Sequence, residues 1–304
     1  MIRRLLNKIE SIYQYRYFSN VEDGAYKFLL KNVYKSTDVD FLENLWQLDY
    51  FRNVLIPKPI PLNGIKKVLV LAPHQDDEAI GCGGTLLKLK DLKVEIEICF
   101  LTNGAELSNL KDSVYIRDRE SSKICEVLNA KKHNLGIDNV KLNISDDHIN
   151  KLVGLLKNDW DLIFTIWPID NPPKHRLCSY ILGLALHQSN YKGQLALYTV
   201  HTALLPNVYV DISDEIDKKQ MLIELYQSQL KNQNYAHLSK GLSAWNSKYL
   251  EVSSKARFIE TFMQIPAIAY TDFQEVYRKS NLNKLFKGHE TCINSFKKLN
   301  NSFH

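Results

Sequence analysis

The stretch "KKVLVLAPHQDDEAIGCGG", residues 66–84, joins a continuous apolar run to a histidine, three consecutive acids and three glycines. A short, wholly apolar run is typical of a strand that is buried on both faces, as in a parallel sheet. Leucines at helical spacing follow and predict a helix directly after it. The charged residues therefore lie in the turn that follows a buried strand. Charge at such a position is costly unless it has a structural or chemical role.

Strands and helices alternate along the rest of the chain. The patterns predict further strands at 94–102, 161–168, 194–200 and 208–213, a weaker one at 139–144, and helices at 112–132, 146–158 and 214–230. Strands separated by helices imply right-handed crossovers and a parallel sheet. The expected fold class is α/β: a Rossmann-like, doubly wound, mostly parallel sheet with helices on both faces and extra N- and C-terminal helices.

The chain has one clear boundary near its start. The segment "PKPIPLNG" (57–64) interrupts a helical pattern that covers residues 1 to about 55, because prolines cannot continue a helix. We therefore predict a helical N-terminal extension with a proline-rich connector at 1–62. The main domain is predicted at 63–304, and its tail from residue 231 is helical and polar.

The composition is that of an ordinary globular protein, with 45% hydrophobic residues among 304 and a net charge of +5. No concentrated basic stripe points to nucleic acid. Five widely spaced cysteines without a CxxC pair favour the reducing cytoplasm. No segment has the apolar core of a secretory signal or the roughly 18 apolar residues of a membrane span. The basic, tyrosine-rich start could lie on a membrane surface, although nothing else in the sequence indicates such a contact.

The turn after the first strand has the residue types of a metal site. His74 and Asp77 are three residues apart there, and ligands of parallel sheets bind beyond the carboxyl ends of the strands. A catalytic zinc ion takes three protein ligands and keeps one position open. His175 in "WPIDNPPKHRL" (167–177) follows the end of another apolar strand, so it is the candidate for the third ligand.

Two further acids belong to the same turn. Asp76 lies beside the ligands without having to be one, and a carboxylate there can take a proton from water that a metal has activated. Such an arrangement hydrolyses amides or esters. Glu78 is interpreted as an acid that orients a ligand or caps the following helix.

These residues resemble the N-acetylglucosaminyl-phosphatidylinositol de-N-acetylase (PIG-L/LmbE-like) family of zinc N-deacetylases, whose signature is a strand ending in "PHPDDE" before a glycine-rich helix start. The resemblance covers residues 66 to about 265. It includes "FLTNGAE" (100–106), "RDRESSKICEVLNA" (117–130), "HRL" (175–177), "PNVYVDISDEIDKKQMLIELYQSQ" (206–229) and "ARFIETF" (256–262), the last of which resembles a late helix of the family.

The resemblance implies a specific activity. Zinc would be held by His74, Asp77 and His175, and Asp76 would be the general base. The substrate would be an N-acetylamino sugar in a small molecule, a glycoconjugate or a glycolipid, and the products would be a free amine and acetate. Arg117, at the start of a long helix, is a candidate for holding a substrate phosphate or carboxylate, although helix arginines commonly form surface pairs instead.

The sequence departs from the family pattern at three positions. Gln75 replaces the proline of the motif, which should be harmless because the side chain points away from the metal. Pro172 stands where the family's "HPDH" segment begins with a histidine assigned to the oxyanion or leaving group, and Thr199 stands where many members have glutamate. His201, just past a strand end, is the candidate replacement for the missing histidine, with His148 as a weaker one.

These departures keep a second function open, namely a catalytically altered relative that binds metal and a glycan or partner without turnover. Two other interpretations are weaker. The "GCGG" segment resembles a dinucleotide fingerprint, but Leu86 stands where the third glycine belongs; the glycines are better explained by close packing of the helix on the sheet. A magnesium phosphohydrolase fits poorly, because histidine ligands favour zinc.

Overall fold

A computed structural model describes residues 57–302, apart from 232 and 252, together with residues 9, 44 and 48. The predicted helices of the N-terminal extension lie outside the described residues. Among the residues described, no helix is long and apolar enough to cross a membrane. All five cysteines are free and buried.

The described part of the chain is built around one eight-stranded sheet with the order β1-β7-β8-β6-β5-β2-β3-β4. Its parallel centre comprises β6 (Gln194–Tyr198), β5 (Leu162–Ile166), β2 (Lys67–Ala72), β3 (Glu95–Thr102) and β4 (Ala130–Ile137). Strand β8 (Ile259–Pro266) runs antiparallel to β6 and to β7 (Val208–Asp211), and β7 pairs with β1 (Lys58–Pro59). The predicted α/β fold with a mostly parallel sheet is confirmed.

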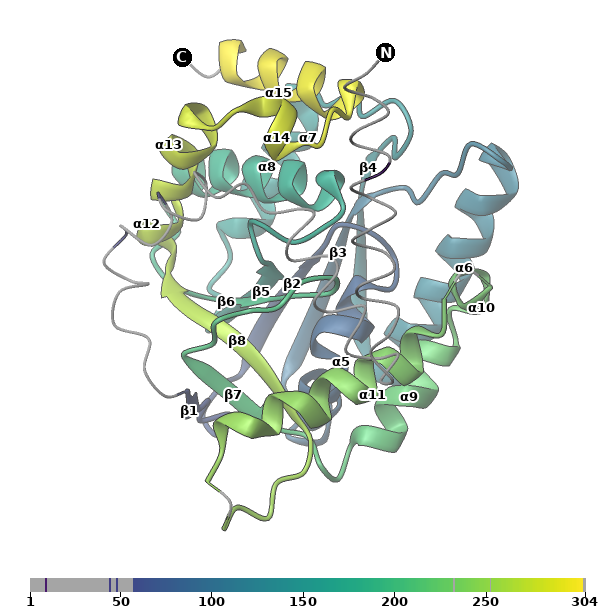
Figure 1. Cartoon of the computed structure of the whole chain (residues 1–304), viewed down its shortest axis with the longest axis vertical. Coiled ribbons are helices and arrows are strands. Elements are labelled where there is room, and N and C mark those ends of the chain that lie inside the picture. The colour runs from purple at the N-terminus through teal and green to yellow at the C-terminus, as the bar shows by residue number, and fades with distance from the viewer. Residues whose placement is uncertain are drawn as a thin grey trace.

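Helices cover both faces of this sheet (Figure 1). One face carries α5 (Asp77–Asp91), α6 (Leu110–Leu128), α9 (Ile216–Glu224) and α11 (Tyr235–Asn246), with the short α10 (Gln227–Leu230) beside α6 and a 3-10 turn, η1 (Ser247–Tyr249), after α11. The other carries α7 (Asp146–Leu156), α8 (Pro173–Ser189), α12 (Ala267–Tyr270), α13 (Asp272–Lys279), α14 (Leu282–Leu285) and α15 (Glu290–Ser302). Each face has its own hydrophobic core.

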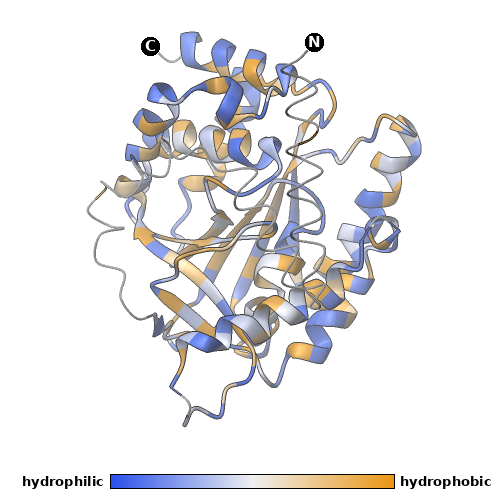
Figure 2. Ribbon diagram, viewed as in Figure 1, coloured by the Kyte–Doolittle hydropathy of each residue, from blue (hydrophilic) through white to orange (hydrophobic). Residues whose placement is uncertain are grey.

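The side-chain alternation of β2 explains these two cores. Val68 and Val70 belong to the core under α5, and Leu69 and Leu71 belong to the core under α8. Because successive residues of a strand point to opposite faces, a strand buried on both faces must be apolar throughout. Figure 2 shows the resulting hydrophobic central strands.

Several element boundaries differ from the predictions. The expected strand at 139–144 is wrong, since the fourth parallel strand is β4 at 130–137 and α6 ends before it. Asn129 ends that helix in the left-handed conformation (φ 51°), which asparagine tolerates better than most residues. The segment "AKKHNLGI" of β4 is a polar edge strand and therefore lacks the continuous apolar run of its neighbours.

Two further corrections concern the C-terminal half. The segment at 256–262, which resembles a family helix, instead leads into strand β8. The single helix predicted at 214–230 is divided into α9 and α10, with Tyr226 between them. The strand at 259–266 was not predicted because the tail from residue 231 was interpreted as helical. It enters the sheet antiparallel, next to β6.

The helix after the metal-site turn is broken, and a distant acid supports the break. Cys82 has a non-helical conformation (φ −142°) inside α5. The amide groups of Gly84 and Thr85, just beyond the break, donate to the carboxylate of Glu260 on β8 at 2.8 and 2.7 Å. The ammonium of Lys219 on α9 lies 2.7 Å from the same carboxylate, and both side chains are 2% exposed. Glu260 thus links α5 to strand β8.

Close packing accounts for two glycines of the "GCGG" segment. A Cβ atom on Gly81 would lie 2.2 Å from the ring of Tyr198 on β6, and one on Gly84 would lie 2.8 Å from the side chain of Ile212. No larger side chain fits at this distance, so the glycines let α5 approach the sheet. This supports the packing explanation over a dinucleotide site.

The Lys219–Glu260 pair allows a test of this arrangement. We expect Lys219→Met to lower the free energy of unfolding by about 3–5 kcal/mol, because the substitution leaves a buried carboxylate without its countercharge. Denaturant unfolding followed by circular dichroism measures the change. Lys218→Met, at an exposed neighbouring position of α9, is the matched control. An equal effect of the two substitutions would contradict the role given to Glu260.

Candidate metal centre

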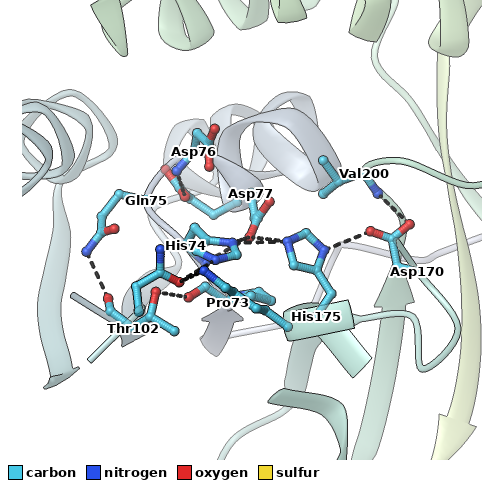
Figure 3. A network of polar contacts seen from close by, with 12 residues as sticks. Pro73, His74, Gln75, Asp76, Asp77, Thr102, Asp170, His175 and Val200 are labelled. Carbon is cyan, nitrogen blue, oxygen red and sulfur yellow. Dashed lines mark hydrogen bonds and ion pairs between the residues drawn. The ribbon is translucent and has the colours of Figure 1, made fainter. Parts of the chain in front are cut away.

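Three side chains meet at the carboxyl end of the sheet, and they are the three predicted as metal ligands (Figure 3). His74 Nδ1 lies 3.0 Å from His175 Nε2 and 3.3 Å from Asp77 Oδ2. His175 Nε2 also lies 3.3 Å from Asp77 Oδ2. The three donor atoms form a nearly equilateral triangle.

The triangle has the dimensions that zinc requires. Bonds of about 2.0–2.1 Å in a tetrahedron place neighbouring ligand atoms about 3.3 Å apart. Two imidazole nitrogens and a carboxylate oxygen are also a common donor set for catalytic zinc, and three ligands leave the fourth corner open. The residues present therefore fit a zinc ion in both chemistry and spacing.

The local fold explains how the triangle arises. Strands β2 and β5 pair side by side, so the segments that leave their carboxyl ends emerge next to each other. His74 follows β2 directly, Asp77 begins α5, and His175 lies in the first turn of α8. The amide of His74 donates to Asp77 Oδ2 at 2.8 Å, which holds the turn closed.

Each histidine uses its second nitrogen to fix its orientation. His175 Nδ1 lies 2.9 Å from Asp170 Oδ2, and His74 Nε2 lies 3.0 Å from Asn139 Oδ1. The amide nitrogen of Asn139 donates to the carbonyl of Ala105, so its oxygen faces the imidazole. Both acceptors select the tautomer that leaves the other nitrogen's lone pair for a metal.

Asp170 and Asn139 were not predicted as site residues. Asp170 carried a usable signal, because it follows the end of β5 by four residues and precedes His175 by five. Asn139 carried none, since it belongs to the loop after β4, the strand whose position was wrongly predicted.

Burial and neighbouring charges shape the protonation of the ligands. Burial lowers the pKa of His74 to about 4. Burial alone would also lower the pKa of His175, but the carboxylates of Asp77 and Asp170 outweigh it and raise that pKa. The pKa of Asp77 would rise on burial, yet the imidazoles of His175 and His74 hold it below its usual range. Asp77 is therefore an anion facing two imidazoles.

Asp76, the predicted general base, lies next to the triangle in an unusual conformation. It is 8% exposed and has a φ of 131°, a region that non-glycine residues seldom enter. Its amide donates to Glu78 Oε2 at 3.2 Å, and its carbonyl accepts from Ala79 and Ile80. Among the described residues, no side chain or amide donates to its carboxylate. Burial, with the Asp77 carboxylate adding to it, raises the pKa of Asp76 well above its usual range.

Glu78 stabilises the backbone conformation of Asp76 by accepting the hydrogen bond from its amide. Its other oxygen, Oε1, accepts a 2.6 Å hydrogen bond from the hydroxyl of Tyr226. Burial raises the pKa of Glu78 to about 7, although the Tyr226 hydrogen bond opposes the shift. Glu78 thus contacts the backbone of Asp76 and makes no contact with the triangle of donor atoms.

The ring of His201 lies near the triangle, as does a tyrosine that was not predicted. The ring centroids of His201 and His175 are 5.6 Å apart, and the ring of Tyr235, the first residue of α11, is 6.0 Å from that of His201. Ser239, one turn further along α11, donates to the carbonyl of Ile80 and so fixes α11 against α5. Tyr235 had no sequence signal, because its segment could not be placed in the fold.

Burial and charge also affect these two side chains. Burial lowers the pKa of His201, while Asp170 partly opposes the shift. Burial raises the pKa of Tyr235 to about 12, and the carboxylates of Asp76 and Asp77 add to the effect. Both rings are thus uncharged near neutral pH, and the Tyr235 hydroxyl lies within the field of the acids.

The remaining predicted positions have clear surroundings. Arg117 is buried and donates to Glu106 Oε1 at 2.7 Å and to Gln229 Oε1 at 2.6 Å. Gln75 donates to the carbonyl of Thr102 and points away from the triangle (Figure 3). Pro172 precedes α8 and provides no side-chain hydrogen bond to its first turn. His148 takes part in the capping box of α7 with Ser145 instead.

The chain is similar in sequence to known deacetylases. Residues 69–186 match the profile of the PIG-L family, described as GlcNAc-PI de-N-acetylase. The chain is 29% identical over 199 residues to a diacetylchitobiose deacetylase of Thermococcus kodakarensis, covering 56% of this chain and 72% of that one.

Solved structures show the same fold. An N,N'-diacetylchitobiose deacetylase of Pyrococcus horikoshii is 25% identical, with a TM-score of 0.59, and the match covers 77% of this chain and 95% of the other. A 4-carboxy-2-hydroxymuconate hydratase of Pseudomonas putida is 14% identical with a TM-score of 0.57, covering 66% and 96%. The second likeness concerns the fold alone, so the fold by itself does not decide the chemistry. The motif, the donor triangle and the family match decide the family: residues 69–186 of this chain belong to the PIG-L, or LmbE-like, family.

Proposed function

We propose that this protein is a zinc-dependent N-deacetylase that removes the acetyl group from an N-acetylamino sugar, in a glycoconjugate, a glycolipid or a sugar precursor. The observation that carries the proposal is the triangle of His74, Asp77 and His175 with the carboxylate of Asp76 beside it, to which no described residue donates a hydrogen bond. The named activity of the T. kodakarensis and P. horikoshii relatives, deacetylation of diacetylchitobiose, supports it.

In this proposal, His74, Asp77 and His175 hold the metal. Zinc, when bound, supplies a Lewis acid that lowers the pKa of water toward neutrality. Asp76 accepts a proton from the water that attacks the acetamide carbonyl, and it then delivers that proton to the sugar nitrogen as the C–N bond breaks. The products are acetate and the free amine, so all atoms of amide and water are accounted for.

The oxyanion of the tetrahedral intermediate requires a hydrogen-bond donor, and Pro172 supplies none. We assign this role to His201, whose ring lies beside that of His175. Tyr235, whose ring packs edge-on against His201, places a phenol on the same side. Arg117 remains our candidate for a substrate anion, and its pairing with Glu106 and Gln229 fixes the guanidinium in place.

A location in the cytoplasm belongs to the same proposal. It is supported by the five cysteines, all of which are free thiols, as expected in a reducing compartment.

The metal site is testable without a substrate. We expect the purified chain to bind about one zinc ion, measured by elemental analysis after dialysis, and His175→Ala to lose it because a ligand is missing. His187→Ala, at an exposed position of the same helix, is the control and should bind zinc normally. Zinc retained by His175→Ala would show that the ion is held elsewhere.

The hydrogen bond between His175 Nδ1 and Asp170 leads to a second prediction. Asp170→Asn places an amide donor opposite His175 Nδ1 and so favours the wrong tautomer, while its remaining oxygen can still accept from His201 and Thr202. Zinc affinity should fall about 10- to 100-fold, as measured by competition with a chelator. The exposed Asp159→Asn should leave affinity unchanged, and unchanged affinity in Asp170→Asn would refute the positioning role.

The base is tested by acetate release from N,N'-diacetylchitobiose and other N-acetylglucosamine conjugates. Asp76→Asn should reduce turnover by about 10²- to 10⁴-fold with zinc still bound, since asparagine tolerates the same backbone conformation but cannot accept the proton. Asp91→Asn, exposed at the end of α5, should be fully active. A zinc-loaded wild type that releases no acetate from any conjugate would favour the alternative, a relative that binds a glycan without turnover.

A further inference from the structure

A partly buried cation lies beside the candidate metal centre. Lys174 lies in the first turn of α8, directly before His175, and its side chain is partly buried. Its Nζ lies 3.3 Å from Asn139 Oδ1, the atom that also contacts His74 Nε2. Within the described part of the chain, no carboxylate lies within ion-pair distance of this ammonium. Its hydrogen bond among the described residues is the one to this amide oxygen.

Four acids of this region are engaged by other groups. Asp170 accepts from His175 and from the segment after β6, and Asp77 faces the two imidazoles. Asp138 accepts from the amides of Val140 and Lys141. Glu106 accepts from Arg117. A partly buried charge ordinarily has a counterion, because dehydration is costly.

A second cation, Arg117, is linked to Lys174 through Asn139, Ala105 and Glu106. Asn139, the partner of Lys174, donates to the carbonyl of Ala105, and the next residue, Glu106, pairs with Arg117. The hydrogen bond from Arg117, together with a weaker effect of the Lys174 charge, holds the pKa of Glu106 below its usual range. Glu106 therefore faces two cations, Arg117 at hydrogen-bond distance and Lys174 further away.

We infer that Lys174 is a specificity-determining residue that binds an anionic group, a carboxylate or a phosphate, on the acetylated sugar, with Arg117 on the other side of Glu106. The inference rests on the proposed deacetylation and names the class of its substrate. The ammonium supplies the countercharge that an anionic sugar needs, and its contact with Asn139 holds it next to the ligand His74. A neutral sugar leaves the ammonium unpaired.

The test compares matched substrates that differ only in charge: N-acetylglucosamine, its 6-phosphate, and the corresponding uronic acid. We expect kcat/KM to be higher for at least one of the two anionic sugars, and the arm that responds identifies the anion. Lys174→Met should lower kcat/KM for that sugar about 10- to 100-fold, mainly through KM, as loss of a charge-assisted hydrogen bond implies. It should change the value for the neutral sugar less than about 2-fold.

Two variants separate binding from a structural role. Lys174→Arg should retain most of the selectivity, and Lys141→Met, at an exposed position of the Asn139 loop, should behave as wild type. If Lys174→Met slowed the neutral and anionic sugars equally, Lys174 would only orient Asn139 and His74, and the inference would be wrong. A wild type that prefers neither anion would also overturn it.

Calorimetric binding of the same sugars to zinc-loaded protein needs no turnover and separates the two proposals. Tighter binding of an anionic sugar that Lys174→Met abolishes, without acetate release from any substrate, would uphold the role of Lys174 and reject deacetylation. Acetate release with equal affinities of wild type and Lys174→Met for the anionic sugar would uphold deacetylation and reject the role of Lys174.

Discussion

The candidate site depends on the hydrogen bonds that the carboxylate of Asp170 accepts. One oxygen accepts from His175 Nδ1 at 2.9 Å, and the other accepts from the amide of His201 at 3.0 Å and the hydroxyl of Thr202 at 2.8 Å. A single buried side chain after β5 thereby joins the ligand on α8 to the segment that leaves β6. The orientation of His175 and the position of His201 are set together.

The acids near this contact are distinguished by their partners. Asp77 is held as an anion by two imidazoles, Glu78 accepts from Tyr226, and Asp170 accepts from three donors in addition to His175. Asp76 receives no such hydrogen bond among the described residues. Because burial disfavours an isolated carboxylate, it favours the neutral, protonated acid, and a nearby cation would instead stabilise the charged form. The environment, more than the residue type, distinguishes Asp76 from the other acids of the site.

The sequence was a good guide where the chemistry follows a strand end. The triangle of candidate ligands could be predicted because β2 and β5 are continuous apolar runs and the candidate ligands lie in the segments that follow them. The same rule would have found Asp170. It could not find Asn139, because β4 is a polar edge strand without that signal, nor Tyr235, whose position depends on the packing of α11 against α5. The antiparallel β8 was missed for a related reason: its pairing with β6 is set by tertiary contacts, such as that of Glu260 with the broken α5, and not by local pattern.

The distance along the chain between the ligands has a consequence for how the protein folds. His74 and His175 are 101 residues apart in sequence, and the pairing of β2 with β5 brings the segments that contain them together. A contact with such a long loop forms late, after the cost of closing the loop has been met. A metal ion therefore cannot direct the early steps of folding, as it does in small zinc domains whose ligands are neighbours. An ion held by these residues would bind a sheet that is already assembled, and it would slow the reopening of that sheet.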